Sequence, residues 1–345
     1  MMRLCVLLLI VVSSLGKDAN LPEINLRFYK MGEYPEYREV HINQAAELFY
    51  SSWYNSSRPF VIYVHGFTEH CDGEAATNIT SALATLDYNV FCLDWGTLAY
   101  DFEIDGPNLA LYPLAVGNVE VVGLALVDAI NNEIHKGNMV PSQVNCIGFS
   151  LGAHVCGFLR NLDSKPSVIV GLDPAGPLFD TESPITQRLT SDDADTVHVV
   201  HSDRGWLGTN RDDGHANFYI NDGKRTQPGC SIFLAVDKGC SHTRAWMYYT
   251  EAILNPNSSV ATKCDNYDKF MLNFCENVYY GFRFPVDTNA NGKLYLNTNP
   301  NVPYLKGRSL TGVAGIQPVP RSMFQGISTM NDMFVNPLKL FGIMK

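Results

Sequence analysis

From about residue 58 the chain alternates short apolar runs with longer amphipathic ones. Four runs rich in valine, isoleucine, phenylalanine and tyrosine predict β-strands, at residues 58–66, 88–95, 143–150 and 167–173. Helical spacing follows or separates them, at residues 72–86, 116–136 and 151–162. Because strands that alternate with helices are joined by right-handed crossovers, this pattern predicts an α/β fold with a mainly parallel central sheet and helices on both faces.

Segments at either end fall outside this pattern. Residues 1–16 look like a secretory signal peptide, with a positive start at Arg3, an apolar run over residues 4–12 and small residues near the end. Residues 305–345 contain scattered methionine and phenylalanine without a sustained period, so we expect a tail there and no separate domain. Residues 17–304 are expected to form one domain. After the signal peptide, no apolar stretch reaches the length of about 18 residues that a membrane-spanning helix needs.

The composition narrows the possible partners and the compartment. The 345 residues carry a formal net charge of −10, which repels nucleic-acid phosphates and anionic lipid headgroups. Nine cysteines are present, and removal of the leader with Cys5 leaves eight, an even number suited to an oxidising compartment. Three N-x-S/T sequons are candidate glycosylation sites, at Asn55, Asn78 and Asn257. We therefore expect a secreted, extracellular glycoprotein that binds no nucleic acid.

The strongest chemical signal is the G-x-S-x-G motif centred on Ser150. It lies where a predicted strand ends, at Gly148, and a predicted helix begins, at about Leu151. So sharp a turn forces strained backbone angles on the serine, and the glycines at 148 and 152 remove side chains that would clash. The turn presents the serine hydroxyl at the carboxyl edge of the sheet, so we predict that Ser150 is a nucleophile.

A serine nucleophile needs a histidine base and an acid that orients it, and in this kind of fold they follow in the order serine, acid, histidine. Asp173 ends the next predicted strand and should lie at the same sheet edge. Two histidines follow it in loop contexts, His215 and His242. We choose His242, since it follows a short loop between two cysteines and precedes a helix. His154 is expected to pack beneath the elbow, meaning the sharp turn at Ser150. His198 and His201 are expected to be structural or to lie in an exposed turn.

Two backbone N–H groups should stabilise the oxyanion. One belongs to Leu151, the residue after the nucleophile, and the other to Phe67 in the loop after an early strand. His65 and Gly66 are expected to shape that loop, and a role for His65 as a second base is the alternative. Together these residues predict acyl transfer through a covalent acyl-enzyme, with water as the final acceptor.

Seven stretches of the chain resemble, in order, the animal (pancreatic-type) lipase family. They are HGF (65–67), LDW (93–95), GFSLGAH (148–154), GLDPAGP (171–177), NFYINDG (217–223), QPGC (227–230) and CSHTRA (240–245). The resemblance covers about residues 25–304 and implies an α/β-hydrolase fold without the family's C-terminal β-sandwich. It places Ser150, Asp173 and His242 on the family's catalytic triad, and Phe67 and Leu151 on its oxyanion donors.

The resemblance also assigns the cysteines around the apolar loop. It implies the disulfides Cys230–Cys240 and Cys264–Cys275, whereas Cys71, Cys92, Cys146 and Cys156 stay open between three pairings and buried free thiols. The loop that the first pair closes matches the family's lid, shortened as in the phospholipase A1 branch. Its residues Ile232, Phe233 and Leu234 are expected to contact lipid, or alternatively to pack inward on the core.

Many relatives bind a structural calcium ion in the region that matches residues 181–195. Here Asp193 matches one ligand, but Ile185 and Thr190 stand where other oxygen ligands are expected, so the site looks broken. We interpret the acidic run Asp192, Asp193 and Asp195 as solvated surface. The sequence indicates no metal, no cofactor and no protein partner.

The residues and the resemblance together predict a secreted carboxylic ester hydrolase that acts on lipid at an interface. A phospholipase A1 that releases the sn-1 acyl chain of phospholipids is the first hypothesis, and a neutral acylglycerol lipase, for example a digestive one, is the alternative. A non-catalytic lipid-binding or storage protein of the insect yolk type is a hypothesis of another class. The presence of all three triad residues argues against it.

Overall fold

The computed structural model describes residues 23–101, 109–182, 184–231 and 239–307. Within them eleven strands form one sheet: β1 Asn25–Tyr29, β2 Tyr37–His41, β3 Phe60–Val64, β4 Asn89–Asp94, β5 Val144–Phe149, β6 Val168–Leu172, β7 Thr196–His201, β8 Ala216–Ile220, β9 Val260–Lys263, β10 Tyr279–Gly281 and β11 Gly292–Leu296. The α-helices are α2 Ala46–Phe49, α3 Glu74–Leu83, α4 Gly96–Ala99, α5 Tyr112–His135, α6 Leu151–Gly157, α8 Cys240–Leu254 and α9 Tyr267–Met271. Short 3-10 turns lie at Ile42–Gln44, Leu109–Leu111, Pro141–Gln143, Phe158–Asn161, Ser191–Asp193 and Asn221–Gly223.

The sheet order is β10-β9-β11-β8-β7-β6-β5-β3-β4-β1-β2. The strands from β11 to β4 in this order run parallel, and antiparallel strands extend the sheet at both edges. Each of the four predicted strands and three predicted helices has a counterpart at its expected place. The predicted α/β class with a mainly parallel sheet is therefore confirmed.

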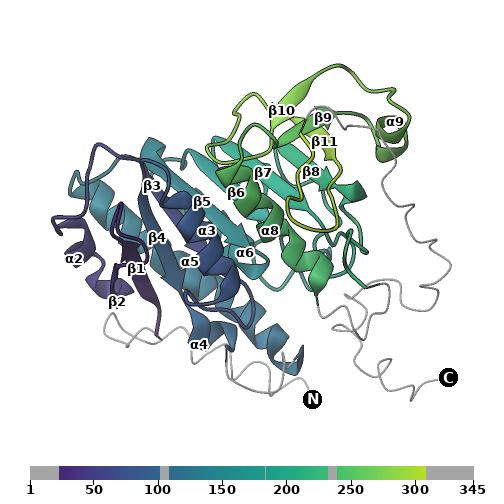
Figure 1. Cartoon of the computed structure of the whole chain (residues 1–345). Helices are drawn as coiled ribbons and strands as arrows, with labels where there is room; N and C mark the ends of the chain where they lie inside the picture. The colour runs from purple at the N-terminus through teal and green to yellow at the C-terminus, as the bar shows by residue number, and fades with distance from the viewer. Residues whose placement is uncertain (1–22, 102–108, 183, 232–238, 308–345) are drawn as a thin grey trace, which may run out of the picture.

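Helices cover both faces of the sheet (Figure 1). α3 and α8 lie side by side in front of the sheet in this view, and their apolar residues join one cluster of buried side chains. α5 and α6 contribute to a second cluster, on the opposite face. Every residue of β3, β5 and β6 is buried, which explains why these strands read as continuous apolar runs without polar alternation.

The apolar character of α5 requires one correction. By length and composition alone, Leu109–His135 could cross a membrane, contrary to the sequence expectation. Half of its most apolar window is buried inside the protein, and residues such as Val116, Val119 and Leu126 have no exposed surface. The helix is therefore apolar on the side that it packs against the sheet, as expected for a core helix of a globular protein.

Four disulfides join the eight cysteines of the described residues. Two of them link Cys230 with Cys240 and Cys264 with Cys275. The cysteines that the sequence left open are also paired, Cys71 with Cys92 and Cys146 with Cys156. The last bridge ties β5 to α6 across the turn that carries Ser150, so it holds both sides of that turn.

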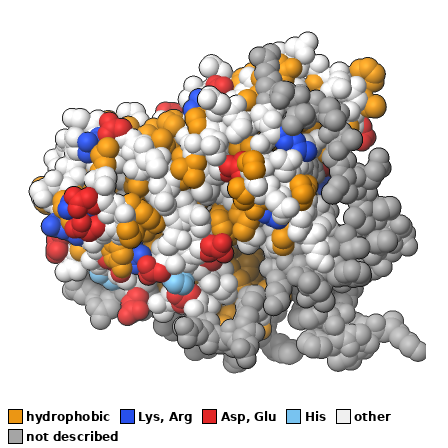
Figure 2. Space-filling view, viewed as in Figure 1, with side chains coloured by type: hydrophobic (Ala, Val, Ile, Leu, Met, Phe, Trp, Pro, Cys, Tyr) orange, Lys and Arg blue, Asp and Glu red, His pale blue; other side chains and the backbone are white. Residues whose placement is uncertain are grey.

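Several sequence expectations lie outside the described residues. These are the signal peptide at residues 1–16 with Cys5, the lid residues Ile232, Phe233 and Leu234, and the tail from residue 308 onward. The three sequon residues are described, and Asn55, Asn78 and Asn257 are all exposed. On the face shown in Figure 2, acidic and basic side chains are interspersed among apolar and uncharged ones.

Candidate active site

The turn at Ser150 connects β5 directly to α6. Ser150 has φ 54° and ψ −118°, a conformation that L-residues rarely adopt. The chain passes so tightly that a Cβ at Gly148 would lie 2.3 Å from the Gly152 carbonyl oxygen. A Cβ at Gly152 would lie 2.1 Å from the Val64 carbonyl oxygen. Only glycine fits at either position, so the spacing of the motif follows from the packing of this turn.

Asp173 follows β6, the strand next to β5 in the sheet. The two turns are bonded to each other, because the Ser150 N–H donates to the Leu172 carbonyl at 3.0 Å and the Ala175 N–H donates to the Ser150 carbonyl at 3.2 Å. The carboxylate is completely buried, and its Oδ1 accepts the N–H groups of Ser202 at 2.8 Å and Asp203 at 3.1 Å. These bonds orient Oδ2 toward the imidazole of His242.

His242 lies in the first turn of α8, and its Nδ1 is 2.6 Å from Asp173 Oδ2. Because a carboxylate only accepts hydrogen bonds, Nδ1 carries the proton and Nε2 is left as the basic nitrogen. The ring packs on Phe149, with centroids 4.7 Å apart, and Phe149 directly precedes Ser150. The structure thus brings Ser150, Asp173 and His242 together at the carboxyl edge of the parallel strands.

Four other histidines that the sequence analysis considered have structural positions. His215 is exposed, and its Nδ1 accepts the N–H of Val197 near the start of β7, at the opposite edge of the sheet from Ser150. His154 lies beneath the elbow as expected, where its Nε2 donates to the Ala175 carbonyl at 2.8 Å and burial lowers its pKa to about 4. His198 and His201 are both buried, and burial lowers the pKa of each to about 4.

The loop after β3 lies against Ser150. A Cβ at Gly66 would be 3.0 Å from Ser150 Cβ, so the backbone of this loop approaches the serine closely. The ring of Phe67, the next residue, packs edge-on against Tyr112 of α5 at 5.3 Å. Leu151 is the first residue of α6, where N–H groups have no partner within the helix. The backbone N–H groups of Phe67 and Leu151 therefore belong to segments that flank Ser150.

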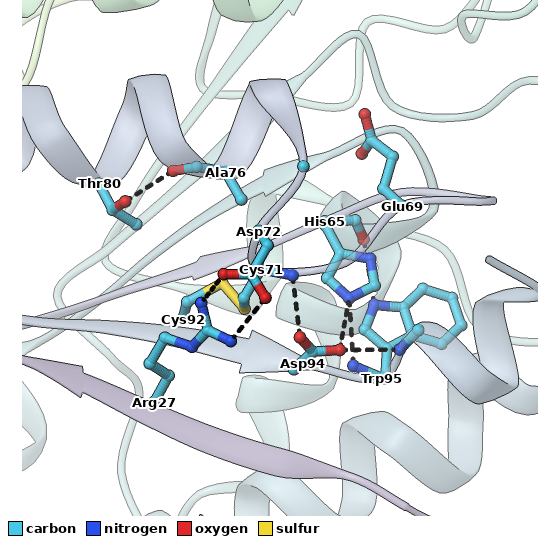
Figure 3. The surroundings of a disulfide bond; sticks show 12 residues. Arg27, His65, Glu69, Cys71, Asp72, Ala76, Thr80, Cys92, Asp94 and Trp95 are labelled. Carbon is cyan, nitrogen blue, oxygen red and sulfur yellow. Dashed lines mark hydrogen bonds and ion pairs between the residues drawn. A yellow bond between two sulfur atoms is a disulfide. The ribbon is translucent and has the colours of Figure 1, made fainter. Parts of the chain in front are cut away.

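Glu69 is a residue of this loop that sequence reasoning missed. Its Oε2 accepts the Gly66 N–H at 2.8 Å, and burial raises the pKa of its carboxyl. In Figure 3 the Glu69 side chain extends from the loop in the direction away from Asp94, which lies beneath His65. The sequence offers one signal for this contact, an acidic residue three positions after a glycine in a tight turn. That spacing does not reveal which backbone N–H donates to the carboxylate.

His65 supports the loop from below. The Trp95 N–H donates to its Nε2 at 3.1 Å, and the indole N–H donates to the His65 carbonyl at 3.1 Å. The two rings are stacked 5.5 Å apart (Figure 3). Asp94 continues this network by accepting the Cys71 N–H beside the Cys71–Cys92 disulfide. Because its ring is buried and already bonded, His65 fits the expected structural role better than that of a second base.

A buried ion pair supports the Asp173 carboxylate, and sequence reasoning missed it as well. Arg225 Nε donates to Asp203 Oδ1 at 2.8 Å, and its Nη2 lies 2.5 Å from Oδ2. Asp203 in turn donates its backbone N–H to Asp173. Burial raises the pKa of Asp203, although Arg225 opposes the change. No local pattern connects Arg225 to Asp173, since 52 positions separate them along the chain.

The region of the family's calcium site has an arginine instead of a ligand set. Asp193 is completely buried, which corrects the expectation that the whole acidic run is solvated; Asp192 and Asp195 are exposed. Arg160 Nη1 lies 3.2 Å from Asp193 Oδ1, and Thr190 donates both its N–H and its hydroxyl to the same carboxylate. Ile185 is 59% exposed and offers no side-chain oxygen. These residues do not fit a calcium ion, which requires six to eight oxygen ligands.

Known proteins resemble this chain in sequence. The family model described as Lipase matches residues 11–304. Phospholipase A1 VesT1.02 of Vespa tropica is 39% identical over 195 residues, which cover 55% of this chain and 64% of that protein. A phospholipase A1 of Vespa crabro is 38% identical over 204 residues, covering 57% and 66% of the two chains. The match thus spans slightly less than two thirds of each wasp protein. Among solved structures, an alpha/beta hydrolase enzyme from a Medee basin deep-sea metagenome library is 14% identical, with a TM-score of 0.29 over 52% of this chain and 69% of its own.

Proposed function

Because this chain belongs to the lipase family, we propose that it is a secreted serine ester hydrolase that releases the sn-1 acyl chain of phospholipids. The observation that carries the proposal is the 2.6 Å bond between His242 Nδ1 and Asp173 beside the strained Ser150 turn. A nucleophile, a base and an orienting acid on three separate elements are the minimal set for acyl transfer.

The reaction follows from the roles that these atoms allow. Ser150 Oγ attacks the ester carbonyl carbon while His242 Nε2 takes its proton, and Asp173 stabilises the imidazolium that forms. The N–H groups of Phe67 and Leu151 donate to the oxyanion, a contribution worth about 2.7–4 kcal/mol per donor in comparable sites. His242 then protonates the departing lysophospholipid alkoxide, and water repeats the sequence on the acyl-enzyme to release the fatty acid.

The substrate class rests on the relatives and on the short cysteine loop. The similar wasp proteins are phospholipases A1, and the Cys230–Cys240 bridge closes a segment with a sequence separation of only 10. A lid this short favours a site open to phospholipids. Four disulfides and the leader-like residues 1–16 support secretion, since disulfides persist in oxidising compartments. The second candidate, a neutral acylglycerol lipase, is favoured by the match to the Lipase model itself.

The test compares the purified protein with Ser150→Ala. Both are offered vesicles whose phospholipids carry different acyl chains at sn-1 and sn-2, and separately a triacylglycerol emulsion. We expect serine-dependent release of the sn-1 fatty acid, with little release from the emulsion. Release mainly from the emulsion would favour the neutral lipase, and equal release by the Ser150→Ala protein would contradict the assigned nucleophile.

A further inference from the structure

A polar cavity of about 500 Å³ lies beside the catalytic aspartate and is not used by the acyl-transfer mechanism. It is lined by Gly176, Pro177, Asp180, Arg204, Gly205, Trp206, Asn210, Arg211, Asp212 and Asp213. We propose that this cavity binds a zwitterionic phospholipid headgroup, meaning a phosphate diester that carries an ammonium group. The inference rests on the proposed function and names the part of the substrate that the triad does not touch.

The cavity wall is continuous with the reaction centre. Gly208, within the loop that forms one wall, lies so close that a Cβ there would be 2.4 Å from Asp173 Oδ1. The other wall begins at Gly176, whose N–H donates to the Leu207 carbonyl at 2.8 Å. Gly176 directly follows Ala175, which is bonded to the Ser150 carbonyl. In a glycerophospholipid the phosphate and the sn-1 ester share one three-carbon glycerol, so a headgroup site must lie this near the serine.

Arg211 supplies the donors that a phosphate needs. Its Nε is 3.3 Å from Asp213 Oδ1, 45% of its side chain is exposed, and its two terminal nitrogens have no hydrogen-bond partner among the described residues. Arg204 adds a second guanidinium, bonded to the neutral Asn210 carbonyl and 4.0 Å from Asp212. Guanidinium groups bind phosphate oxygens through paired, charge-assisted hydrogen bonds, which makes them suited to a diester.

The carboxylates decide which phosphates fit. Asp180, Asp212 and Asp213 line the cavity together with the two guanidinium groups. Cations from outside the lining also reach two of these carboxylates, because Lys293 Nζ lies 3.0 Å from Asp212 Oδ2 and Arg188 Nε lies 3.8 Å from Asp213 Oδ2. Asp180 accepts the Thr209 hydroxyl and the Asn210 N–H but forms no ion pair among the described residues, so its carboxylate attracts an ammonium group attached to the phosphate. Trp206 also lines the cavity, and the Arg225 guanidinium already lies over its ring, 4.9 Å from the centroid. The lining therefore matches a phosphate with an attached cation better than a phosphate alone.

Binding is tested apart from turnover, with glycerophosphocholine as a soluble probe. The full chain carrying Ser150→Ala is titrated with the probe by calorimetry, with and without Arg211→Gln. Arg58→Gln is the matched control, because Arg58 also pairs with one aspartate, at 2.5 Å from Asp87, and lies just before β3 at the opposite edge of the sheet. We expect Arg211→Gln to weaken binding about tenfold, the effect of one charge-assisted hydrogen bond. Arg58→Gln should leave binding unchanged, and glycerophosphoglycerol should bind several-fold more weakly.

Turnover provides a second readout in the Ser150-containing protein. Arg211→Gln should lower the ratio of phosphatidylcholine to p-nitrophenyl butyrate hydrolysis about tenfold, mainly through KM, and far-UV circular dichroism establishes that the variant is folded. Absence of saturable binding, or equal weakening by Arg58→Gln, would overturn the headgroup site. If the probe binds as expected but no fatty acid is released from phospholipid, the proposed function fails and the site stands. If fatty acid is released but Arg211→Gln changes neither binding nor the ratio, the site fails and the proposed function stands.

Discussion

Glu69 offers the sharpest test of the oxyanion site that we propose for this protein. Its Oε2 accepts the Gly66 N–H at 2.8 Å, and the Gly66 backbone lies against Ser150. Phe67, whose N–H we assign to the oxyanion, is the next residue. Glu69 is bonded to the residue before that donor, through the Gly66 N–H, which makes it a positioning residue, and its removal should loosen the donor without deleting it.

The magnitude follows from the bond that is lost. A hydrogen bond to a charged acceptor contributes about 1.5–3 kcal/mol, and 1.4 kcal/mol corresponds to about tenfold. Complete loss of one oxyanion donor costs about 10²–10³ in kcat. Glu69→Ala should therefore lower kcat between about tenfold and a hundredfold and leave KM nearly unchanged. Glu69→Gln keeps an oxygen acceptor for Gly66 and should retain kcat within about threefold of the native value.

The assay is steady-state hydrolysis of a soluble p-nitrophenyl ester, which avoids effects of the lipid interface. Glu74→Ala is the control, because Glu74 is an exposed acidic residue a few positions further on, at the start of α3. The reasoning would be refuted if Glu69→Ala kept kcat within twofold, or if Glu69→Gln were as impaired as Glu69→Ala. An effect confined to KM would point to substrate binding instead.

Three further outcomes are expected. Asp173→Asn should lower kcat/KM by about 10³–10⁴ in the same assay with little change in Tm, since it leaves the imidazole in the wrong tautomer; a loss below tenfold would contradict its role. His154→Gln should be less stable than the native protein at pH 7, but this difference in the free energy of unfolding should shrink by up to about 3 kcal/mol as the pH falls from 6.5 toward 4. The pKa of His154 is about 4 in the folded protein and 6.5 in the unfolded chain, so the unfolded chain gains the proton first and the native protein loses stability. Denaturant titrations at both pH values measure the difference, and a constant difference would refute the reasoning. Arg160→Met should lower the free energy of unfolding by about 2–3 kcal/mol by leaving Asp193 unpaired, whereas a chelator should leave Tm unchanged; a chelator-induced drop would indicate a bound metal.

The sequence by itself determined the features that depend on a few neighbouring residues. The glycines around Ser150 predicted the sharp turn because the two flanking positions are too crowded for any side chain. Continuous apolar runs predicted the central strands because parallel strands are buried on both faces. Asp173 could be located because it follows the next such run, and the carboxyl ends of parallel strands meet at one edge.

The tertiary structure decided whatever depends on segments distant along the chain. The sequence alone left both His215 and His242 as candidates after Asp173, and only the sheet shows that His215 lies at the edge opposite Ser150. The pairing of Cys146 with Cys156 and the position of Glu69 depend on how a strand, a helix and a loop pack together. Asp193 shows the same limit of sequence analysis. It belongs to an acidic run that looks solvated in the sequence, but the fold buries its carboxylate against Arg160. Burial and partners are set by contacts across the sheet, and neither is encoded in any short stretch of the chain.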